Sequence, residues 1–199
     1  MIVDVVVKVG GGVLEDLDAF RAVAAAVSKA ARRSRVVVVP GGGPFADAVR
    51  SVDARLPLPD DVAHWAAVLA MEQYALLLAS AIGGARLVAT PEEVALALDA
   101  RALPVLAPYQ WLREADPLPH SWDVTSDSIA AWVAAALGAP HLVLVKPAGA
   151  AAEARDVVDG YLERALAPGT VITILPADDV GGLPELVGGS RRGASIGGA

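Results

Sequence analysis

Apolar residues follow two alternating patterns along this chain. Short runs rich in β-branched residues are typical of buried strands and lie at 2–9, 35–40, 86–89, 103–107, 141–146 and 170–175. Between them, apolar residues recur every three to four positions, and helices are expected at 16–33, from 44 to the break at 57–59, and at 60–82, 91–100, 125–137 and 153–167. The segment 108–123 is rich in proline and aromatic residues and is expected to be irregular.

The alternation of strands and helices predicts the fold class. The strands are too apolar to leave one face in water, which favours parallel strands with helices on both sides. Asp16 and Thr125 can cap helix N-termini, while Gly83 and Gly138 can end helices. We therefore expect an α/β protein, a three-layer αβα sandwich with a largely parallel central sheet. Ligands of such sheets bind outside the carboxyl ends of the strands.

Two of the expected strands end in a glycine triplet. The first is followed by Gly10, Gly11 and Gly12, and the second by Gly41, Gly42 and Gly43. Three glycines let the backbone turn sharply and bring its N–H groups close to an anion at the start of the next helix. Tight turns alone would explain either triplet but explain both poorly. The pattern predicts phosphate binding at two neighbouring strand ends.

Lys8 is the strongest candidate for a catalytic residue. It stands one position from the end of a buried strand and two before Gly10. An ammonium group there is costly unless it meets a fixed anion, and a phosphate is the natural anion. The alternative is a lysine on an edge strand that extends its ammonium group into water.

Asp127 falls in the first turn of the helix expected at 125–137. The helix dipole and the free N–H groups of that turn keep a carboxylate ionised. Such a carboxylate can hold a lysine or a metal ion, or it can only support the helix. Asp123 and Thr125 are both candidates for the N-cap.

Three histidines offer little metal chemistry. His64, at the start of the helix expected at 60–82, could donate to a phosphate or a substrate, although such a histidine is more often structural. His120 and His141 do not have metal-ligand spacing with it, so no metal site is expected.

A dinucleotide site is an alternative at the second triplet. Gly41 to Ala46 fits G-x-G-x-x-A between a strand and a helix, with Asp60 about 20 residues on, as in dinucleotide-binding oxidoreductases. Against this, Pro44 lacks a backbone donor and the first triplet is left unexplained. No Walker A motif is present.

Length and composition narrow the class of protein further. The 199 residues are 55% apolar, with a mean hydropathy of +0.50. A chain of this size and composition can bury one apolar core, so a single domain over 1–199 is expected. The net charge of -7, with the 16 Lys and Arg residues scattered, argues against nucleic-acid and membrane partners. Without cysteine, disulfides and thiolate metal sites are excluded.

Membrane insertion and export are not expected. The apolar helix at 60–82 is interrupted by polar residues, so a buried helix is favoured over a membrane span. The first residues enter a strand without the pattern of a signal peptide, and a cytoplasmic location is expected.

Four motifs occur in one order over nearly the whole chain: Lys8-Val9-Gly10-Gly11-Gly12, Pro40-Gly41-Gly42-Gly43, Thr125-Ser126-Asp127-Ser128-Ile129-Ala130 and Gly193-Ala194-Ser195-Ile196. With them, the chain resembles the amino acid kinase superfamily, which includes acetylglutamate, aspartate, uridylate and isopentenyl phosphate kinases. Residues 70–74 and 118–127 look most like the branch that contains the kinase of methanofuran biosynthesis.

The resemblance implies phosphoryl transfer from ATP with Mg²⁺. In that branch the acceptor is an (aminomethyl)furan-methyl phosphate, which becomes a diphosphate in one-carbon cofactor biosynthesis. The resemblance assigns Lys8 and the first triplet to the transferring phosphoryl group, and the second triplet to the acceptor. Asp127 would orient Lys8. Trp122 and Asp123 could bracket the furan ring and its ammonium group.

The segment before the last strand is shorter than the resemblance implies. Superfamily kinases usually carry a second lysine and a nucleotide-binding segment between the fifth main strand and the final one. Here Lys146, at a strand end, is the candidate for that catalytic and nucleotide-binding lysine, and the C-terminal nucleotide-binding part is shortened.

Two further functions are left open by the residues. One is a kinase of the same superfamily with a carboxylate or a nucleoside monophosphate as acceptor. The other is a non-catalytic subunit that binds a nucleotide or oxyanion, which the short segment favours and the presence of Lys8 and Asp127 disfavours. The apolar helix at 61–82 has more apolar surface than one sheet face can cover, so a homo-oligomer is expected.

Overall fold

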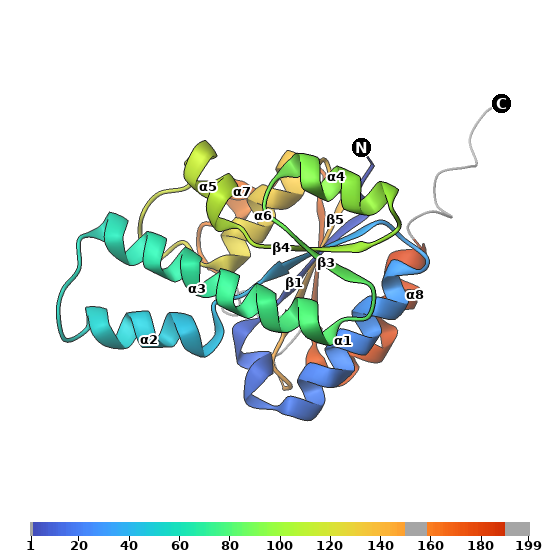
Figure 1. The fold of residues 1–199 in the computed structure, drawn as a ribbon, viewed down its shortest axis with the longest axis horizontal. Coiled ribbons are helices and arrows are strands. Elements are labelled where there is room, and N and C mark those ends of the chain that lie inside the picture. The colour runs from blue at the N-terminus through green and yellow to red at the C-terminus, as the bar shows by residue number, and fades with distance from the viewer. Residues whose placement is uncertain (1, 150–158, 190–199) are drawn as a thin grey trace.

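A six-stranded parallel sheet forms the centre of the structure, a computed structural model that describes residues 2–149 and 159–189 (Figure 1). Its strands are β1 (Val5–Val9), β2 (Val36–Pro40), β3 (Ala85–Val88), β4 (Leu103–Leu106), β5 (His141–Lys146) and β6 (Val171–Pro176). Their order across the sheet is β3-β4-β2-β1-β5-β6, and all five pairings are parallel. The valine-rich β1 and β2 are buried on both faces at the centre, as expected for parallel strands.

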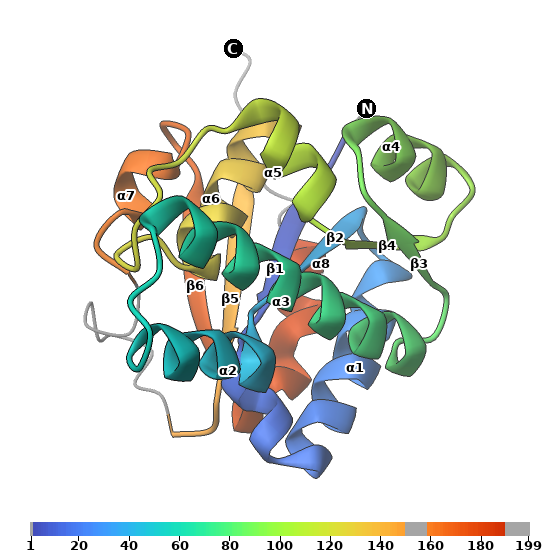
Figure 2. The ribbon, with the colours of Figure 1, turned by 60° about the vertical axis from the view of Figure 1, so that its left-hand side comes forward.

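Helices cover both faces of the sheet (Figure 2). They are α1 (Leu17–Ala31), α2 (Gly43–Asp53), α3 (Asp60–Ala81), α4 (Pro91–Asp99), α5 (Tyr109–Ala115), α6 (Ser126–Leu137), α7 (Leu162–Ala165) and α8 (Leu183–Gly189), with short 3₁₀ segments η1 (Gly11–Glu15) and η3 (Ala177–Gly182). The three-layer αβα fold predicted from the sequence is confirmed.

Alternate side chains of β1 enter two separate apolar cores. Val5, Val7 and Val9 pack with α1 and α8, whereas Val6 packs with α6 on the other face. The long α3 contributes its N-terminal half to the α6 side and its C-terminal half to the α1 side. The two-residue period of a strand therefore decides which side chains of β1 and β5 lie beneath α6.

The expected helix boundaries follow from local capping. The Asp16 carboxylate accepts hydrogen bonds from the backbone N–H groups of Asp18 and Ala19, 2.9 and 3.1 Å away. The Thr125 hydroxyl accepts the N–H of Asp127 at 3.3 Å, so Thr125 is the N-cap of α6 and Asp123 is not. Gly138, with φ of 64°, ends α6 in the left-handed region.

Three segments differ from the expectation. The segment 108–123 is not wholly irregular, because α5 forms within it and buries Trp111 and Leu112. Beyond β6, η3 and α8 were not expected and cover α1. Of the helix expected at 153–167, the described part contains only α7, while 150–158 and the closing motif at 193–196 lie outside the described residues.

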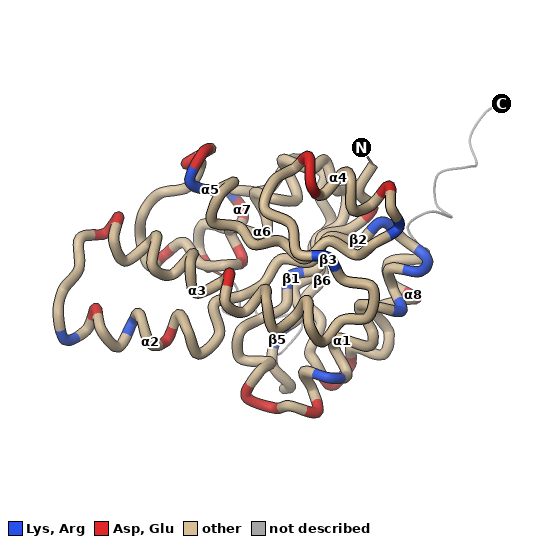
Figure 3. The backbone as a smooth tube through the Cα atoms, viewed as in Figure 1, with Lys and Arg blue, Asp and Glu red and all other residues tan. Residues whose placement is uncertain are grey.

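Within residues 2–149 and 159–189, one helix, α3, is long and apolar enough to cross a membrane by length and composition alone. However, 44% of its most apolar window is buried within the fold, where it packs against β2, β3 and β4. This matches the expected buried helix. Lys and Arg are spread over several elements with Asp and Glu among them (Figure 3).

Candidate active site

Strand register brings two lysines to one place at the carboxyl edge of the sheet. Lys8 lies on the same face of β1 as Val6, and Lys146 on the same face of β5 as Leu144. Because Lys8 pairs with Leu144 across the parallel ladder, Lys146 comes two residues further along the neighbouring strand. Both side chains lie on the face that α6 covers, next to the N-terminus of that helix.

One carboxylate joins the two lysines. The Asp127 oxygens lie 2.9 Å from the Lys8 Nζ and 2.5 Å from the Lys146 Nζ. The three residues are buried, with exposed fractions of 2% for Asp127, 4% for Lys8 and 8% for Lys146. A single carboxylate in contact cannot neutralise two ammonium groups, so the cluster carries excess positive charge that a bound anion would stabilise.

The pKa values in the cluster follow from burial and from the neighbouring charges. Burial by itself would raise the pKa of the Asp127 carboxyl, but Lys8 and Lys146 together hold it below its usual value. Burial lowers the pKa of the Lys146 ammonium, and the charge of Lys8 lowers it further, against the opposing effect of Asp127 and then Asp159. Asp127 is therefore ionised at neutral pH.

The two glycine triplets pack directly against each other. A Cβ atom on Gly11 would lie 2.2 Å from the Gly43 nitrogen, and one on Gly41 would lie 2.6 Å from the Gly11 nitrogen. Gly43 also has φ of 57°, which disfavours any side chain. Both loops can therefore approach each other, and a ligand, only because they carry no side chains.

A cavity of about 340 Å³ opens beside the lysines, within the usual size of small-molecule sites. Gly11 and Gly12 line it from the first triplet, and Gly42 and Gly43 from the second. Gly10 and Gly41 are not among the lining residues. They hold the triplets in place instead, since the N–H of Gly10 donates to Val145 and that of Gly41 to Val9.

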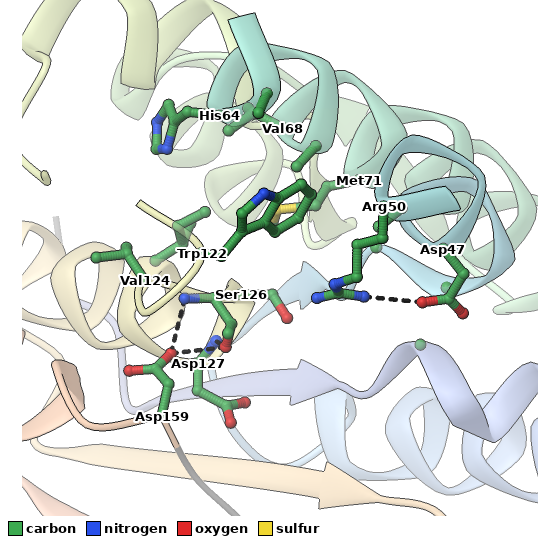
Figure 4. Close-up of a pocket in the computed structure, with 18 of the residues that line it drawn as sticks. Asp47, Arg50, His64, Val68, Met71, Trp122, Val124, Ser126, Asp127 and Asp159 are labelled. Atoms are coloured by element: carbon green, nitrogen blue, oxygen red, sulfur yellow. Dashed lines mark hydrogen bonds and ion pairs between the residues drawn. The ribbon is translucent and has the colours of Figure 1, made fainter. Parts of the chain in front are cut away.

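The far side of the cavity combines an aromatic ring with charged groups (Figure 4). The Arg50 guanidinium lies 5.0 Å from the centre of the Trp122 ring and 2.8 Å from an Asp47 oxygen. The Trp122 indole N–H donates to Asp53 at 2.8 Å, which fixes the ring. This side can therefore contact a flat group and an anion together.

His64 and Asp123 lie at different distances from the centre of the site. His64 lines the cavity and stacks on His120, with ring centres 4.4 Å apart. Burial, followed by repulsion from His120, lowers the pKa of His64 to about 4, so it is neutral at pH 7. Asp123 is exposed and lines a neighbouring surface pocket rather than this cavity.

Three charged lining residues were not predicted from the sequence, namely Asp47, Arg50 and Asp159. Asp60, which the sequence suggested only for a dinucleotide site, also lines the cavity. Asp47 and Arg50 lie on α2 amid other surface charges, and Asp159 stands in a loop without a recognisable motif. The positions of these side chains depend on how the helices pack. The local sequence offers one hint of them, because α2 begins in a glycine triplet and α3 begins directly after a proline break.

The described residues contain no group of three or more His, Asp or Glu placed to hold a metal ion. This does not test the expected Mg²⁺, because that ion commonly binds through one or two carboxylates together with substrate phosphates and water.

A cationic cluster under glycine loops at the carboxyl edge of a parallel sheet suits an enzyme that handles phosphoryl groups. The chain belongs to the amino acid kinase family, whose model matches residues 5–148. It is thus a kinase, which implies the use of ATP and a small-molecule substrate. The family assignment rules out the oxidoreductase alternative.

Relatives support the same assignment. The chain is 26% identical over 183 residues, 91% of its length, to [5-(aminomethyl)furan-3-yl]methyl phosphate kinase from Methanocaldococcus jannaschii, of which it covers 78%. This similarity and the family match confirm the superfamily and branch that the motifs predicted.

Solved structures show the same fold at low identity. UMP kinase from Ureaplasma parvum has a TM-score of 0.68 at 15% identity, with 91% of this chain and 92% of that chain covered. Uridylate kinase from Archaeoglobus fulgidus has a TM-score of 0.68 at 17% identity, with 98% of each chain covered.

Proposed function

We propose that the protein transfers the γ-phosphoryl group of ATP to the phosphate of [5-(aminomethyl)furan-3-yl]methyl phosphate. The bond between the γ-phosphorus and the bridging oxygen of ATP breaks, and a bond forms between that phosphorus and an oxygen of the acceptor phosphate. The products are ADP and the diphosphate. The acceptor oxygen is already anionic, so the reaction needs little proton transfer.

The buried cluster of Lys8, Lys146 and Asp127 carries this proposal. Its excess positive charge lies beside Gly11 and Gly12, where backbone N–H groups can add to the stabilisation of a transferring phosphoryl group. In this assignment both lysines bind phosphoryl oxygens and Asp127 positions them. Lys146 takes the role of the second lysine, and Gly10 shapes the phosphate loop without lining the cavity.

The opposite side of the cavity supports a small acceptor with a ring, an anion and a cation. Arg50 can bind the acceptor phosphate, with Gly42 and Gly43 beside it. Trp122 can stack on the furan ring, and Asp47 and Asp60 offer carboxylates to the ammonium group. His64 is a neutral hydrogen-bonding group at this side, whereas Asp123 lines the neighbouring pocket and has no contact with the acceptor in this assignment.

We further propose that Mg²⁺ enters with the nucleotide. The ion neutralises phosphate charge when bound. Asp127 is held by both lysines, and Asp159 is fully hydrogen-bonded. Neither carboxylate is therefore free to bind Mg²⁺ without losing partners. Beside the lysine cluster, the ion's ligands would be phosphate oxygens and water.

The test is a panel of acceptors with Mg²⁺ and ATP. ADP and phosphorylated product are followed together for the aminomethylfuran phosphate, for UMP and for acetylglutamate. We expect equal amounts of ADP and diphosphate with the furan acceptor, and little product with the others. Turnover with UMP or with the carboxylate instead would contradict the proposed acceptor while leaving the kinase class intact.

Arg50→Met provides the matched test of the acceptor side. The substitution keeps most of the aliphatic length but removes the cation beside Trp122. It should raise the KM for the acceptor and leave the KM for ATP near the wild-type value. A variant with unchanged KM for the acceptor would contradict the assigned role of Arg50.

A further inference from the structure

Asp159 receives five hydrogen bonds from protein donors. Its Oδ2 accepts the backbone N–H of Thr125 at 2.9 Å, the Thr125 hydroxyl at 2.6 Å and the backbone N–H of Ser128 at 3.1 Å. Its Oδ1 accepts the Ser128 hydroxyl and the backbone N–H of Tyr161, the latter at 3.1 Å. Four of the five donors belong to the first turn of α6 or to its N-cap.

This carboxylate has no capacity left for a ligand. A carboxylate offers about four lone-pair sites, and protein groups already occupy them. Asp159 therefore differs from the other acidic residues around the cavity, although it lines that cavity too. Its contacts indicate a role in placing α6 rather than in binding substrate.

A chain of hydrogen bonds leads from Asp159 to the lysine cluster. The Thr125 hydroxyl donates to Asp159 and accepts the backbone N–H of Asp127 at 3.3 Å. Asp127 then reaches both lysines with its carboxylate. Since α6 begins at Ser126, Asp159 fixes the turn from which Asp127 projects (Figure 4).

We propose that Asp159 is a positioning residue for phosphoryl transfer, which clamps the first turn of α6 so that Asp127 holds Lys8 and Lys146 at the transferring group. This role rests on the proposed function. It adds to the reaction a residue that reaches the site from the segment between β5 and β6, far in sequence from α6.

Kinetics of Asp159→Asn test the clamp. Asparagine keeps the shape of the side chain but loses its charge. Its NH₂ group cannot accept hydrogen bonds from the N–H groups that donate to Asp159. Because a displacement of about 1 Å can cost about 10²-fold in rate, kcat should fall by about 10²-fold. The KM for the acceptor should change little, because Arg50 and Trp122 are untouched.

Glu163→Gln is the matched control. Glu163 is an exposed acid of α7, four residues further along the same segment. It should keep wild-type kcat. An equal decrease of kcat in both variants would overturn the proposal, and so would an Asp159→Asn variant in which only the KM for the acceptor changes.

A second variant covers the case in which Asp159→Asn does not fold. Ser128→Ala removes only one donor, and it should lower kcat by a smaller factor. Where both variants fold, the double variant should lose much less than the product of the single losses, since the two groups act through one contact. If the decreases in kcat of the two single variants multiply in the double variant, the two groups do not act through one contact.

The charge of Asp159 also gives a readout without turnover. The chain has three lysines, at 8, 29 and 146, so lysine-selective NMR can follow each ammonium group. The negative charge of Asp159 favours the charged form of Lys146, and Asp159→Asn should therefore lower the pKa of Lys146, whereas Glu163→Gln should not.

This measurement separates the two proposals. If no acceptor is phosphorylated but the Lys146 pKa falls, the proposed function fails, and only the electrostatic link between Asp159 and the lysine cluster remains. If the furan acceptor is phosphorylated and Asp159→Asn changes neither kcat nor the Lys146 pKa, the clamp fails and the proposed function remains.

Discussion

At the scale of single residues, the site depends on how three buried charges are balanced. Asp127 has two cationic partners, whereas each lysine has, among the described residues, only Asp127 as an ion-pair partner. Removal of one lysine therefore leaves a balanced pair, and removal of the carboxylate leaves two buried ammonium groups without a partner. The two kinds of substitution should differ in their effect on stability.

Lys8→Met should lower kcat by about 10²–10³-fold, the usual cost of losing one donor to a developing charge. The fold should persist, because methionine keeps the aliphatic volume and Asp127 retains Lys146. Kinetics together with thermal unfolding check both statements. Lys29→Met, at an exposed position on α1, is the control and should keep full activity.

Asp127→Asn should lower both activity and stability. The free energy of unfolding should fall by up to about 3–5 kcal/mol, the range for a buried ion pair that loses one partner. Denaturant unfolding at pH 7 measures this. Stability equal to that of the wild type would mean that the two lysines are not both charged in the folded protein.

His64 should make stability dependent on pH. Its pKa falls from 6.5 in a solvated histidine to about 4 in the folded protein. The unfolded chain therefore binds the proton first, so this stabilisation is present above pH 6.5 and is lost as the pH falls toward 4. Between pH 7.5 and 5, Tm should fall more for the wild type than for His64→Gln. Parallel decreases in the two proteins would contradict this.

At the scale of elements, the two glycine loops act as one unit. Each begins at the carboxyl end of a central strand, and the pairing of β1 with β2 sets them side by side. Both triplets were predicted to bind ligands, and four of the six glycines line the cavity. The triplets also have a role in packing, because the loops touch through backbone atoms alone.

Gly11→Ala should disturb both loops at once. Its Cβ would meet the backbone of Gly43 at 2.2 to 2.4 Å, and overpacking of this kind costs about 1–3 kcal/mol. Thermal unfolding should show a lower Tm, and the KM for the acceptor should rise. Gly182→Ala is the control, because a Cβ there has no neighbour within 4 Å.

The element boundaries show where local patterns suffice. The strands and most helices were predicted because periodicity, caps and glycine stops are local signals. The helix α5 was missed, because proline and aromatic residues in 108–123 obscure its short period and its helical form depends on the burial of Trp111 and Leu112.

At the scale of the whole molecule, α3 leaves apolar residues uncovered. Val62, Leu69 and Leu76 follow one another at intervals of seven residues, and their exposed fractions are 47%, 43% and 58%. Residues at this interval lie on one side of a helix. The homo-oligomer expected from the sequence stays a prediction, in which a second copy of the chain would cover this ridge.

If this ridge forms the interface of the predicted homo-oligomer, Leu69→Lys with Leu76→Lys should shift the protein from oligomer to monomer in sedimentation analysis. Leu96→Lys on α4 is the matched control, since Leu96 is 61% exposed and lies outside the ridge. It should leave the oligomer intact. A wild-type monomer at micromolar concentration, or equal dissociation in both variants, would contradict the assigned interface.

By itself, the sequence determined the order of the strands and of most helices, the parallel sandwich, and the position of Lys8, Asp127 and both glycine triplets at element ends. These follow from period, burial and local chain geometry. Only the tertiary structure decided that Lys146 shares Asp127 with Lys8, that Arg50 lies on Trp122, and that Asp159 accepts hydrogen bonds from the start of α6. These contacts depend on strand register and helix packing, which join residues far apart in the chain and leave no mark in any short segment.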